Sequence, residues 1–522
     1  EDILIGAFTN QEGGIEAGQS YLFFGKSSGW SLNENVSNAD ASFIGEASYD
    51  YSGICVSGAG DVNGDGYNDI LIGASGNDEG GYLAGQTYLI FGKSSGWSID
   101  MNLKNADASF IGELKGDRSG GSISGVGDVN GDNYDDILIG AQYSGEGRNY
   151  AGQTYLIFGK SSGWSMDMNL SSSDASFIGE TTRDYSGDDI SGAGDVNGDG
   201  YDDILIGAVG KGQTYLIFGK ASNWSMDVSL SNSDASFIGE MPGDMPGASV
   251  SGAGDVDGDG YDDILIGAPR NDEVSTNAGQ AYLIFGKASG WSMDTALSNV
   301  DASFIGESGG PYIGDRLGSS VSGAGDVNGD GYDDIIIGAW HKGRGENPRG
   351  KTYLIPSHGN LRFKTDLTSS NATTGDELTF SVKMEGETPI TSMFVEYWFG
   401  EGKHTNTSMS DKGNLTWNHT IIVPIDMVDK LHYTFSALVL SRFWINTSIR
   451  NITIIDNDKP IFGSDTSSSE SYTGDPVLLS IDVMDNIGVE GVDIEYWFGG
   501  GNHQILAAER KSYPRWEGMV TN

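Results

Sequence analysis

The stretch "GDVNGDGYDDILIGA" at residues 194–208 decides the fold, because close copies of it occur four more times in the chain. The copies align on five aspartates at intervals of 67, 67, 60 and 71 residues: Asp61, Asp128, Asp195, Asp255 and Asp326. Self-similarity at a nearly fixed spacing indicates a repeat architecture. Each repeat joins an acidic, glycine-rich turn to an apolar strand.

Every period contains four apolar runs in a fixed order, represented by residues 174–180, 189–194, 202–208 and 212–220. We name these runs the D, A, B and C strands. The B and C runs are apolar on both faces, which suits strands that lie between neighbouring sheets. Four antiparallel strands per repeat, stacked radially, predict an all-β fold built on a β-propeller.

The strand count leaves the propeller incomplete within this sequence. Six B strands and six C strands can be read, but only five A strands and five D strands. An upstream segment equivalent to residues 41–68 would close a six-bladed ring, and one further period would give seven. Because Glu1 lies in mid-motif, we expect an N-terminally truncated propeller with six or seven blades in the intact protein.

A second kind of repeat follows the propeller. "TGDELTFSV" at 374–382 matches "TGDPVLLSI" at 473–481, and "VEYWFGEGKH" at 395–404 matches "IEYWFGGGNH" at 494–503. The period-two alternation from Val395 predicts strands with one buried face and hence tandem immunoglobulin-like sandwiches. The predicted domains are the propeller at 1–358, one sandwich at 359–459 and a C-terminally truncated second sandwich at 460–522, with residues 456–460 as the linker.

The acidic turn has the composition of a calcium loop. Oxygen-bearing side chains occupy positions 1, 3, 5 and 9 of the turn, and the carbonyl group of a tyrosine can serve at position 7. In an EF-hand position 12 would be acidic, but here it is Ile206 inside a strand, so the turn is a hairpin loop. Asn133 replaces a glycine in the second copy and tolerates a positive φ.

These positions define the predicted ligands of about five Ca²⁺ ions. They are Asp61, Asn63, Asp65, Tyr67 and Asp69; Asp128, Asn130, Asp132, Tyr134 and Asp136; Asp195, Asn197, Asp199, Tyr201 and Asp203; Asp255, Asp257, Asp259, Tyr261 and Asp263; Asp326, Asn328, Asp330, Tyr332 and Asp334. The alternative is a set of metal-free Asx turns. We favour metal because carboxylates crowded into one turn repel one another. The side chain of Asp202 is expected to point to the other strand face and to matter less for the ion.

The motif resembles a known repeat. The Phe-Ile-Gly run, the Gly-Ala pair after the B strand and the DxNGDG turn are similar to FG-GAP repeats of integrin α-subunit propellers and of archaeal and other prokaryotic surface proteins. The resemblance implies calcium in the A–B hairpins on a lower face and ligand contacts from loops on the upper face. The C-terminal modules resemble those that follow such propellers in archaeal surface proteins.

Comparison of the repeats separates a uniform rim from a variable rim. The C–D connections barely change, and the repeated Trp30, Trp97, Trp164, Trp224 and Trp291 within them are expected to pack between blades rather than to bind sugars. The B–C loops and the D–A turns vary, through Tyr49, Arg118, Arg183, Tyr185, Met245, Tyr312 and Arg316. The variation fits either recognition of a partner or unconstrained drift.

Composition limits the partners. The net charge of −45 argues against nucleic acid, and no apolar run of 18 or more residues could span a membrane. With Cys55 as the only cysteine, no intrachain disulfide can form. Weak extracellular-type calcium loops place the protein outside the cell or at its surface. N-glycosylation is predicted at Asn371, Asn406, Asn414, Asn418, Asn446 and Asn451.

No residue pattern nominates a catalytic site, and no cofactor other than calcium is implied. The sequence favours a non-enzymatic, extracellular adhesion or recognition glycoprotein whose propeller binds a protein or glycan ligand through its upper-face loops. The alternative is a carbohydrate-active enzyme, a lyase or hydrolase, or its non-catalytic accessory domain.

Overall fold

The structure is a computed structural model of the 522-residue chain. It describes residues 2–145, 149–241, 243–307, 314–342, 349–357, 362–385, 390–424, 430–439, 443–447, 449–455, 461–467, 476–484, 492–496, 504–512 and 515–521. The chain forms two compact units, the first comprising 1–362, 386–391 and 438–448, and the second comprising 363–385, 392–437 and 449–522. The predicted linker at 456–460 lies outside the described residues.

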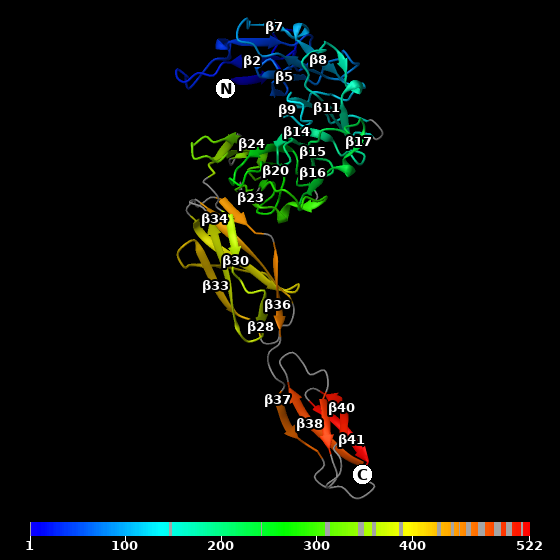
Figure 1. The fold of residues 1–522 in the computed structure, drawn as a ribbon, viewed down its shortest axis with the longest axis vertical. Helices are drawn as coiled ribbons and strands as arrows, with labels where there is room; N and C mark the ends of the chain where they lie inside the picture. The colour runs from blue at the N-terminus through cyan, green and yellow to red at the C-terminus, as the bar shows by residue number, and fades with distance from the viewer. Residues whose placement is uncertain are drawn as a thin grey trace. The chain divides into compact units, whose positions relative to one another are not determined.

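Six antiparallel sheets make up most of the first unit and follow one another in chain order (Figure 1). Sheet 1 contains β1 (Ile3–Ala7), β2 (Gln19–Phe23) and β3 (Ala41–Ile44); sheet 2 contains β4 (Val56–Gly60), β5 (Asp69–Ala74), β6 (Gln86–Ile90) and β8 (Ala108–Ile111). Sheet 3 contains β9 (Ser122–Gly127), β10 (Asp136–Ala141), β11 (Gln153–Ile157) and β13 (Ala175–Ile178).

The remaining three sheets continue the pattern. Sheet 4 contains β14 (Ser186–Gly194), β15 (Asp203–Ala208), β16 (Gln213–Ile217) and β18 (Ala235–Ile238); sheet 5 contains β19 (Ser249–Gly254), β20 (Asp263–Ala268), β21 (Gln280–Ile284) and β23 (Ala302–Ile305). Sheet 6 contains β24 (Leu317–Gly325), β25 (Asp334–Lys342) and β26 (Arg349–Ile355). The described strands thus confirm the predicted six B, six C, five A and five D strands.

Sheets 2–5 have the strand order A, B, C, D, whereas the described strands of sheet 1 are B, C and D and those of sheet 6 are A, B and C. The apolar runs of these strands form the core. In sheet 4, Ile204, Leu205 and Ile206 are all fully buried, because one face of the strand meets the preceding sheet and the other meets the following one. The A strands β4, β9, β14, β19 and β24 lie against one another in succession. This two-sided burial is the arrangement of a radially stacked propeller.

The uniform C–D connections tie each sheet to the one before it. Short strands in these connections add to the outer edge of the preceding D strand in parallel: β7 (Met101–Asn102) on β3, β12 (Met168–Asn169) on β8, β17 (Val228–Ser229) on β13 and β22 (Thr295–Ala296) on β18. A 3₁₀ turn begins directly after each of them: η2 (Leu103–Asn105), η3 (Leu170–Ser172), η4 (Leu230–Asn232) and η5 (Leu297–Asn299), while η1 (Val36–Asn38) precedes β3. Pairing of this kind covers an edge that would otherwise be open.

The repeated tryptophans reinforce these ties. Trp224, in the connection of sheet 4, packs edge-on against Phe158 and Phe177 of sheet 3, with ring centroids 6.0 and 6.3 Å apart. Its indole Nε1 donates to the Lys220 carbonyl group, and the Lys220 ammonium lies 4.6 Å from the ring centroid. Trp97, Trp164 and Trp291 make the same contacts. The predicted packing between blades is therefore confirmed for these four tryptophans, whereas Trp30 is 43% exposed.

From residue 362 onward, the regular secondary structure of the described residues consists of β-strands. One sheet has the order β27 (Arg362–Asp366), β29 (Glu377–Glu385), β33 (Thr416–Ile422), β32 (Ser410–Asp411), and β30 (Ile390–Phe399), β31 (Thr405–Ser408), β34 (Leu431–Val439), β28 (Asn371–Thr373) and β36 (Arg450–Ile455) also pair. A last sheet contains β37 (Ile461–Asp465), β38 (Pro476–Met484), β41 (Arg515–Thr521), β40 (Gln504–Ser512) and β39 (Val492–Tyr496). The immunoglobulin-like assignment stays a prediction.

Two further features complete the fold. β35 (Phe443–Asn446) belongs to the first unit, where it pairs with the outer edge of β23. Within the described ranges there is no α-helix, and none of the described segments forms a helix long and apolar enough to cross a membrane.

The tryptophan contacts lead to a stability prediction. Trp224→Ala removes the packing against two phenylalanines of the preceding sheet, so we expect the free energy of unfolding to fall by about 2–3 kcal/mol, somewhat less than for a fully buried aromatic residue. The matched control is Trp30→Ala, because Trp30 is 43% exposed and stacks mainly on Lys26. Urea denaturation measures both, and equal losses would contradict the packing role.

Candidate metal centre

Each acidic turn curls around its first aspartate. In sheet 4 the turn runs from Asp195 to Asp203, between β14 and β15. The Asp195 carboxylate accepts the backbone N–H groups of Gly198 (2.7 Å), Asp199 (3.1 Å) and Gly200 (2.9 Å). The other four turns repeat these three bonds. The bend requires positive φ at the sixth position, where Asn133 adopts +68° as predicted.

The last aspartate of each turn is buried at the start of the B strand. Asp203 is fully buried, and its carboxylate accepts the N–H groups of Val196 (3.0 Å) and Gly219 (2.8 Å). Burial outweighs these bonds and raises its pKa to about 8, as it does for Asp136 and Asp263, and it raises the pKa of Asp69 to about 7. These four turns therefore each hold a carboxylate whose ionised form a nearby cation would stabilise.

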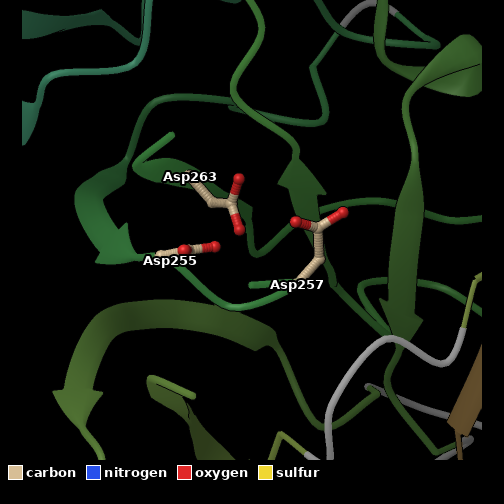
Figure 2. Close-up of side chains that lie close together, drawn as sticks. All are labelled: Asp255, Asp257 and Asp263. Carbon is tan, nitrogen blue, oxygen red and sulfur yellow. The ribbon is translucent and has the colours of Figure 1, made fainter. Parts of the chain in front are cut away.

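Positions 1, 3 and 9 come together in space. In sheet 5, the carboxylates of Asp255, Asp257 and Asp263 offer oxygen atoms that all lie within 4.8 Å of one another (Figure 2). At this separation each pair of charges repels by about 3 kcal/mol for an effective dielectric constant of about 20. Three converging hard oxygen donors therefore fit a cation such as Ca²⁺.

In two other turns the asparagine at position 3 also lies beside the aspartate at position 9. Asn63 Nδ2 lies 3.5 Å from Asp69 Oδ2, and Asn328 Nδ2 lies 3.4 Å from Asp334 Oδ1. In sheet 4 the Asn197 Nδ2 is buried and makes no hydrogen bond. Rotation of these side-chain amide groups by 180° would exchange Nδ2 and Oδ1 and point the oxygen atoms towards the carboxylates of the turn. The hydrogen bonds of the asparagines are compatible with either orientation.

Positions 5 and 7 play a different part in this structure. Asp199 is exposed, and its Oδ1 accepts the N–H group of Tyr201 at 3.1 Å; the equivalent bonds occur in the other four turns. The ring of Tyr201 lies against Gly131 of the preceding turn, so closely that a Cβ atom at Gly131 would come within 2.5 Å of it. The tyrosine side chain therefore links two turns.

Position 8 was not assigned a role from the sequence, yet it connects successive turns. Asp202 Oδ2 accepts the backbone N–H group of Asp128, in the turn of the preceding sheet, at 2.9 Å. The equivalent bonds join Asp135 to Asp61 (2.6 Å), Asp262 to Asp195 (2.8 Å) and Asp333 to Asp255 (3.0 Å). Position 8 is an aspartate in four turns but Asn68 in the first turn. This difference among the repeats was the sequence signal that could have identified the role of position 8.

Backbone contacts strengthen the same connection. The N–H group of Asp202 donates back to the Asp128 carbonyl group at 3.3 Å, and the N–H group of Lys220 donates to the Val129 carbonyl group at 2.8 Å. Both contacts recur between neighbouring turns along the unit. The five acidic turns thus form a continuous chain in which each turn is held by the next.

The variable loops lie at the other ends of the strands. They carry exposed aromatic side chains, namely Phe8 (42%), Tyr49 (50%), Tyr82 (71%), Tyr150 (47%) and Trp340 (55%). Between sheets 3 and 4, the rings of Tyr143, Tyr150 and Tyr185 contact one another, and the Arg118 guanidinium lies 5.5 Å from the Tyr143 ring centroid. Tyr312 lies outside the described residues.

Comparison with known proteins agrees with this geometry. The FG-GAP repeat family model matches residues 56–90, 120–157, 186–217, 246–284 and 317–355. The chain is 29% identical over 241 residues to integrin alpha pat-2 of Caenorhabditis briggsae (43% of this chain, 18% of that protein), 29% over 256 residues to integrin alpha-PS2 of Drosophila melanogaster (47% and 16%), and 32% over 178 residues to integrin alpha-5 of Xenopus laevis (31% and 15%).

The chain spans less than a fifth of the length of these relatives. Among solved structures, a cycloalternan-degrading enzyme from Trueperella pyogenes aligns with 17% identity and a TM-score of 0.14 over 21% of this chain and 17% of that one, which is too slight a likeness to carry an argument.

The repeated four-stranded sheets and their acidic turns define an all-β propeller of the integrin α type. The chain contains five FG-GAP repeats and is an FG-GAP β-propeller protein.

The bonds between turns predict the effect of a mutation at position 8. Asp202→Ala leaves the partly buried Asp128 N–H group without its acceptor, so we expect a loss of about 1 kcal/mol in the free energy of unfolding. Asn68→Ala is the matched control at the same loop position, where the side chain is exposed. Chemical denaturation in excess calcium measures both variants, and an Asp202→Ala variant as stable as Asn68→Ala would contradict the assignment.

Proposed function

We propose that this chain is part of an extracellular, calcium-binding adhesion or recognition protein without enzymatic activity. About five Ca²⁺ ions would bind in the acidic turns, and the loops at the opposite ends of the strands would contact a protein or glycan ligand. The cell-surface location, the adhesive role and the ligand class all belong to this proposal.

The convergence of Asp255, Asp257 and Asp263 carries the metal assignment. A bound Ca²⁺ ion would supply the positive charge that these oxygens lack, and the curled N–H groups around Asp255 would keep its carboxylate pointing inward. The buried Asp263 would then stay ionised, because a cation in contact lowers the pKa of a carboxyl group.

The opposite rim supports the recognition part of the proposal. The loops of this rim differ in sequence from sheet to sheet, whereas the acidic turns and the C–D connections are nearly the same in every repeat. The variable rim could therefore provide the residues that are specific to one ligand. Exposed Tyr and Trp side chains with a neighbouring Arg118 are the residue types that dominate binding interfaces.

The second unit offers sites for the proposed glycosylation. Asn371, Asn406, Asn414 and Asn451 are exposed, and Asn418 is half-buried, where it accepts a hydrogen bond from Ser381. The side chain of Asn446 lies outside the described residues. Glycans on this unit would keep it hydrated and suit it to a spacer role.

The metal assignment predicts a change in ion count. Native mass spectrometry in calcium should detect one ion fewer in Asp199→Ala than in the unmodified chain, because position 5 supplies a ligand only when the ion is present. Asn68→Ala serves as the control and should keep the full count. A chelator should lower the melting temperature of the propeller, since ligands that bind only the folded state stabilise it. An unchanged count in Asp199→Ala would refute this ligand assignment.

The recognition assignment predicts binding without turnover. On arrays of purified glycans and surface proteins, the chain should retain selected ligands in calcium and release them in a chelator. The same ligands, incubated with the chain in solution, should remain intact. Hydrolysis or elimination products from a polysaccharide would instead establish the carbohydrate-active enzyme.

A further inference from the structure

The dipeptide Asn-Gly occurs four times in this sequence, and every copy lies in an acidic turn. The copies occupy positions 3 and 4 of their turns and are Asn63-Gly64, Asn130-Gly131, Asn197-Gly198 and Asn328-Gly329. Sheet 5 has Asp257-Gly258 at the same two positions. Asparagine followed by glycine is chemically reactive, because glycine has no side chain to shield its backbone nitrogen from the neighbouring amide group.

The reaction of such a pair is an intramolecular substitution. The backbone nitrogen of Gly198 loses its proton and attacks the side-chain carbon Cγ of Asn197, so that a new N–Cγ bond forms and the Cγ–Nδ2 bond breaks. Nδ2 takes up a proton through the solvent and leaves as ammonia, and a cyclic succinimide remains. Water then opens the ring at either carbonyl carbon and yields aspartate or isoaspartate. Water is the one co-reactant, and it reaches the exposed Gly198.

In the folded turn the attacking nitrogen is already engaged. The Gly198 N–H group donates to Asp195 Oδ1 at 2.7 Å. The equivalent bonds are 2.8 Å from Gly64 to Asp61, 2.6 Å from Gly131 to Asp128 and 2.6 Å from Gly329 to Asp326. Hydrogen bonds to an ionised carboxylate are among the strong ones. Attack requires the nitrogen to give up its proton beside a negative charge, which makes the nitrogen anion harder to form.

The amide group that would be attacked is less firmly held. Asn197 is half-buried, and within the described residues its Nδ2 has no hydrogen-bond partner. Asn63 and Asn130 are also half-buried, and Asn328 is exposed. The hydrogen bond to the carboxylate at position 1 is therefore the contact that restrains the nucleophile in this turn.

We propose that the Asn-Gly pairs of the acidic turns are latent deamidation sites, and that the aspartate at position 1 keeps each of them in the amide form by holding the glycine N–H group. Asp195 is thus a protecting residue for Asn197 and not only a residue that shapes the turn. Opening of the turn releases the N–H group, and the reaction then proceeds, because local opening exposes backbone groups that the native state engages.

One of the two products has a counterpart in the chain. Asp257 shows that the turn accepts a carboxylate at position 3, where it lies beside Asp255 and Asp263. Deamidation of Asn197 to aspartate converts the turn of sheet 4 into this form and adds a negative charge. Isoaspartate instead adds a carbon atom to the main chain and shifts every later residue of the turn from its place.

Peptide mapping by mass spectrometry of the full chain, aged in neutral buffer, tests the proposal. Asp195→Ala should deamidate at Asn197 at least about tenfold faster than the unmodified chain, which corresponds to a barrier lower by about 1.4 kcal/mol. Asn63 in the same molecule is the internal control, because Gly64 keeps its bond to Asp61, and its rate should not change. The acceleration should appear both in calcium and in a chelator, since it does not require an ion.

Two further variants separate loss of the carboxylate from loosening of the turn. Asp203→Asn changes the buried position 9 but leaves the bond from Gly198 to Asp195 in place, so Asn197 should stay slow. Asp195→Asn keeps an acceptor oxygen and loses the charge, so Asn197 should react faster even if Asp195→Ala fails to fold. Circular dichroism and the melting temperature check folding of all three variants.

Three results would each overturn the proposal. The first is an Asn197 rate in the folded Asp195 variants equal to that of the unmodified chain. The second is equal acceleration in Asp203→Asn, which would assign the protection to the rigidity of the turn. The third is an acceleration in calcium that disappears in the chelator, which would assign the protection to a bound ion and leave the proposed calcium sites standing.

Discussion

The propeller depends on how the crowded carboxylates of the acidic turns are compensated. In each turn one aspartate is buried against the B strand, and the first aspartate is encircled by backbone N–H groups. Burial without an opposite charge favours the protonated form, as the raised pKa of Asp203 shows. A cation among the oxygens would remove this conflict and would fix the shape of the turn.

The shape of one turn matters to its neighbours because the turns are joined. Asp202 and Tyr201 of one sheet reach back to the turn of the preceding sheet, and the tryptophan of the same sheet packs on the outer edge of that sheet. Inner and outer contacts thus act on the same junction. Ordering of one turn should therefore help to order the next, and the opposite rim can vary in sequence while these contacts between sheets are kept.

Local sequence patterns predict much of this fold. The period-two and two-sided apolar runs locate the strands, and the residue types of the turn "DVDGDGYDD" at 255–263 identify the oxygen donors that the structure brings together at positions 1, 3 and 9. The contacts between sheets are harder to foresee. The bond from Asp202 to Asp128, 74 residues earlier, depends on the stagger of two sheets, which no local pattern encodes.

The glycines illustrate the same limit. A sequence shows that Gly6 and Gly338 are equivalent, but only the structure shows that an added Cβ atom would clash with a backbone carbonyl oxygen at Gly6 and would make only ordinary contacts with Ser320 at Gly338. The exposed Leu354 in turn marks a surface that the pattern of its strand would place in the core. Both findings require the relative placement of successive sheets.

Anomalous X-ray diffraction from crystals grown in millimolar calcium tests the central claim most directly. The account predicts an anomalous peak inside each of the five acidic turns, in contact with the oxygens of positions 1, 3 and 9. Ordered turns that lack such peaks would show that hydrogen bonds and protonation alone hold them, and would contradict the account.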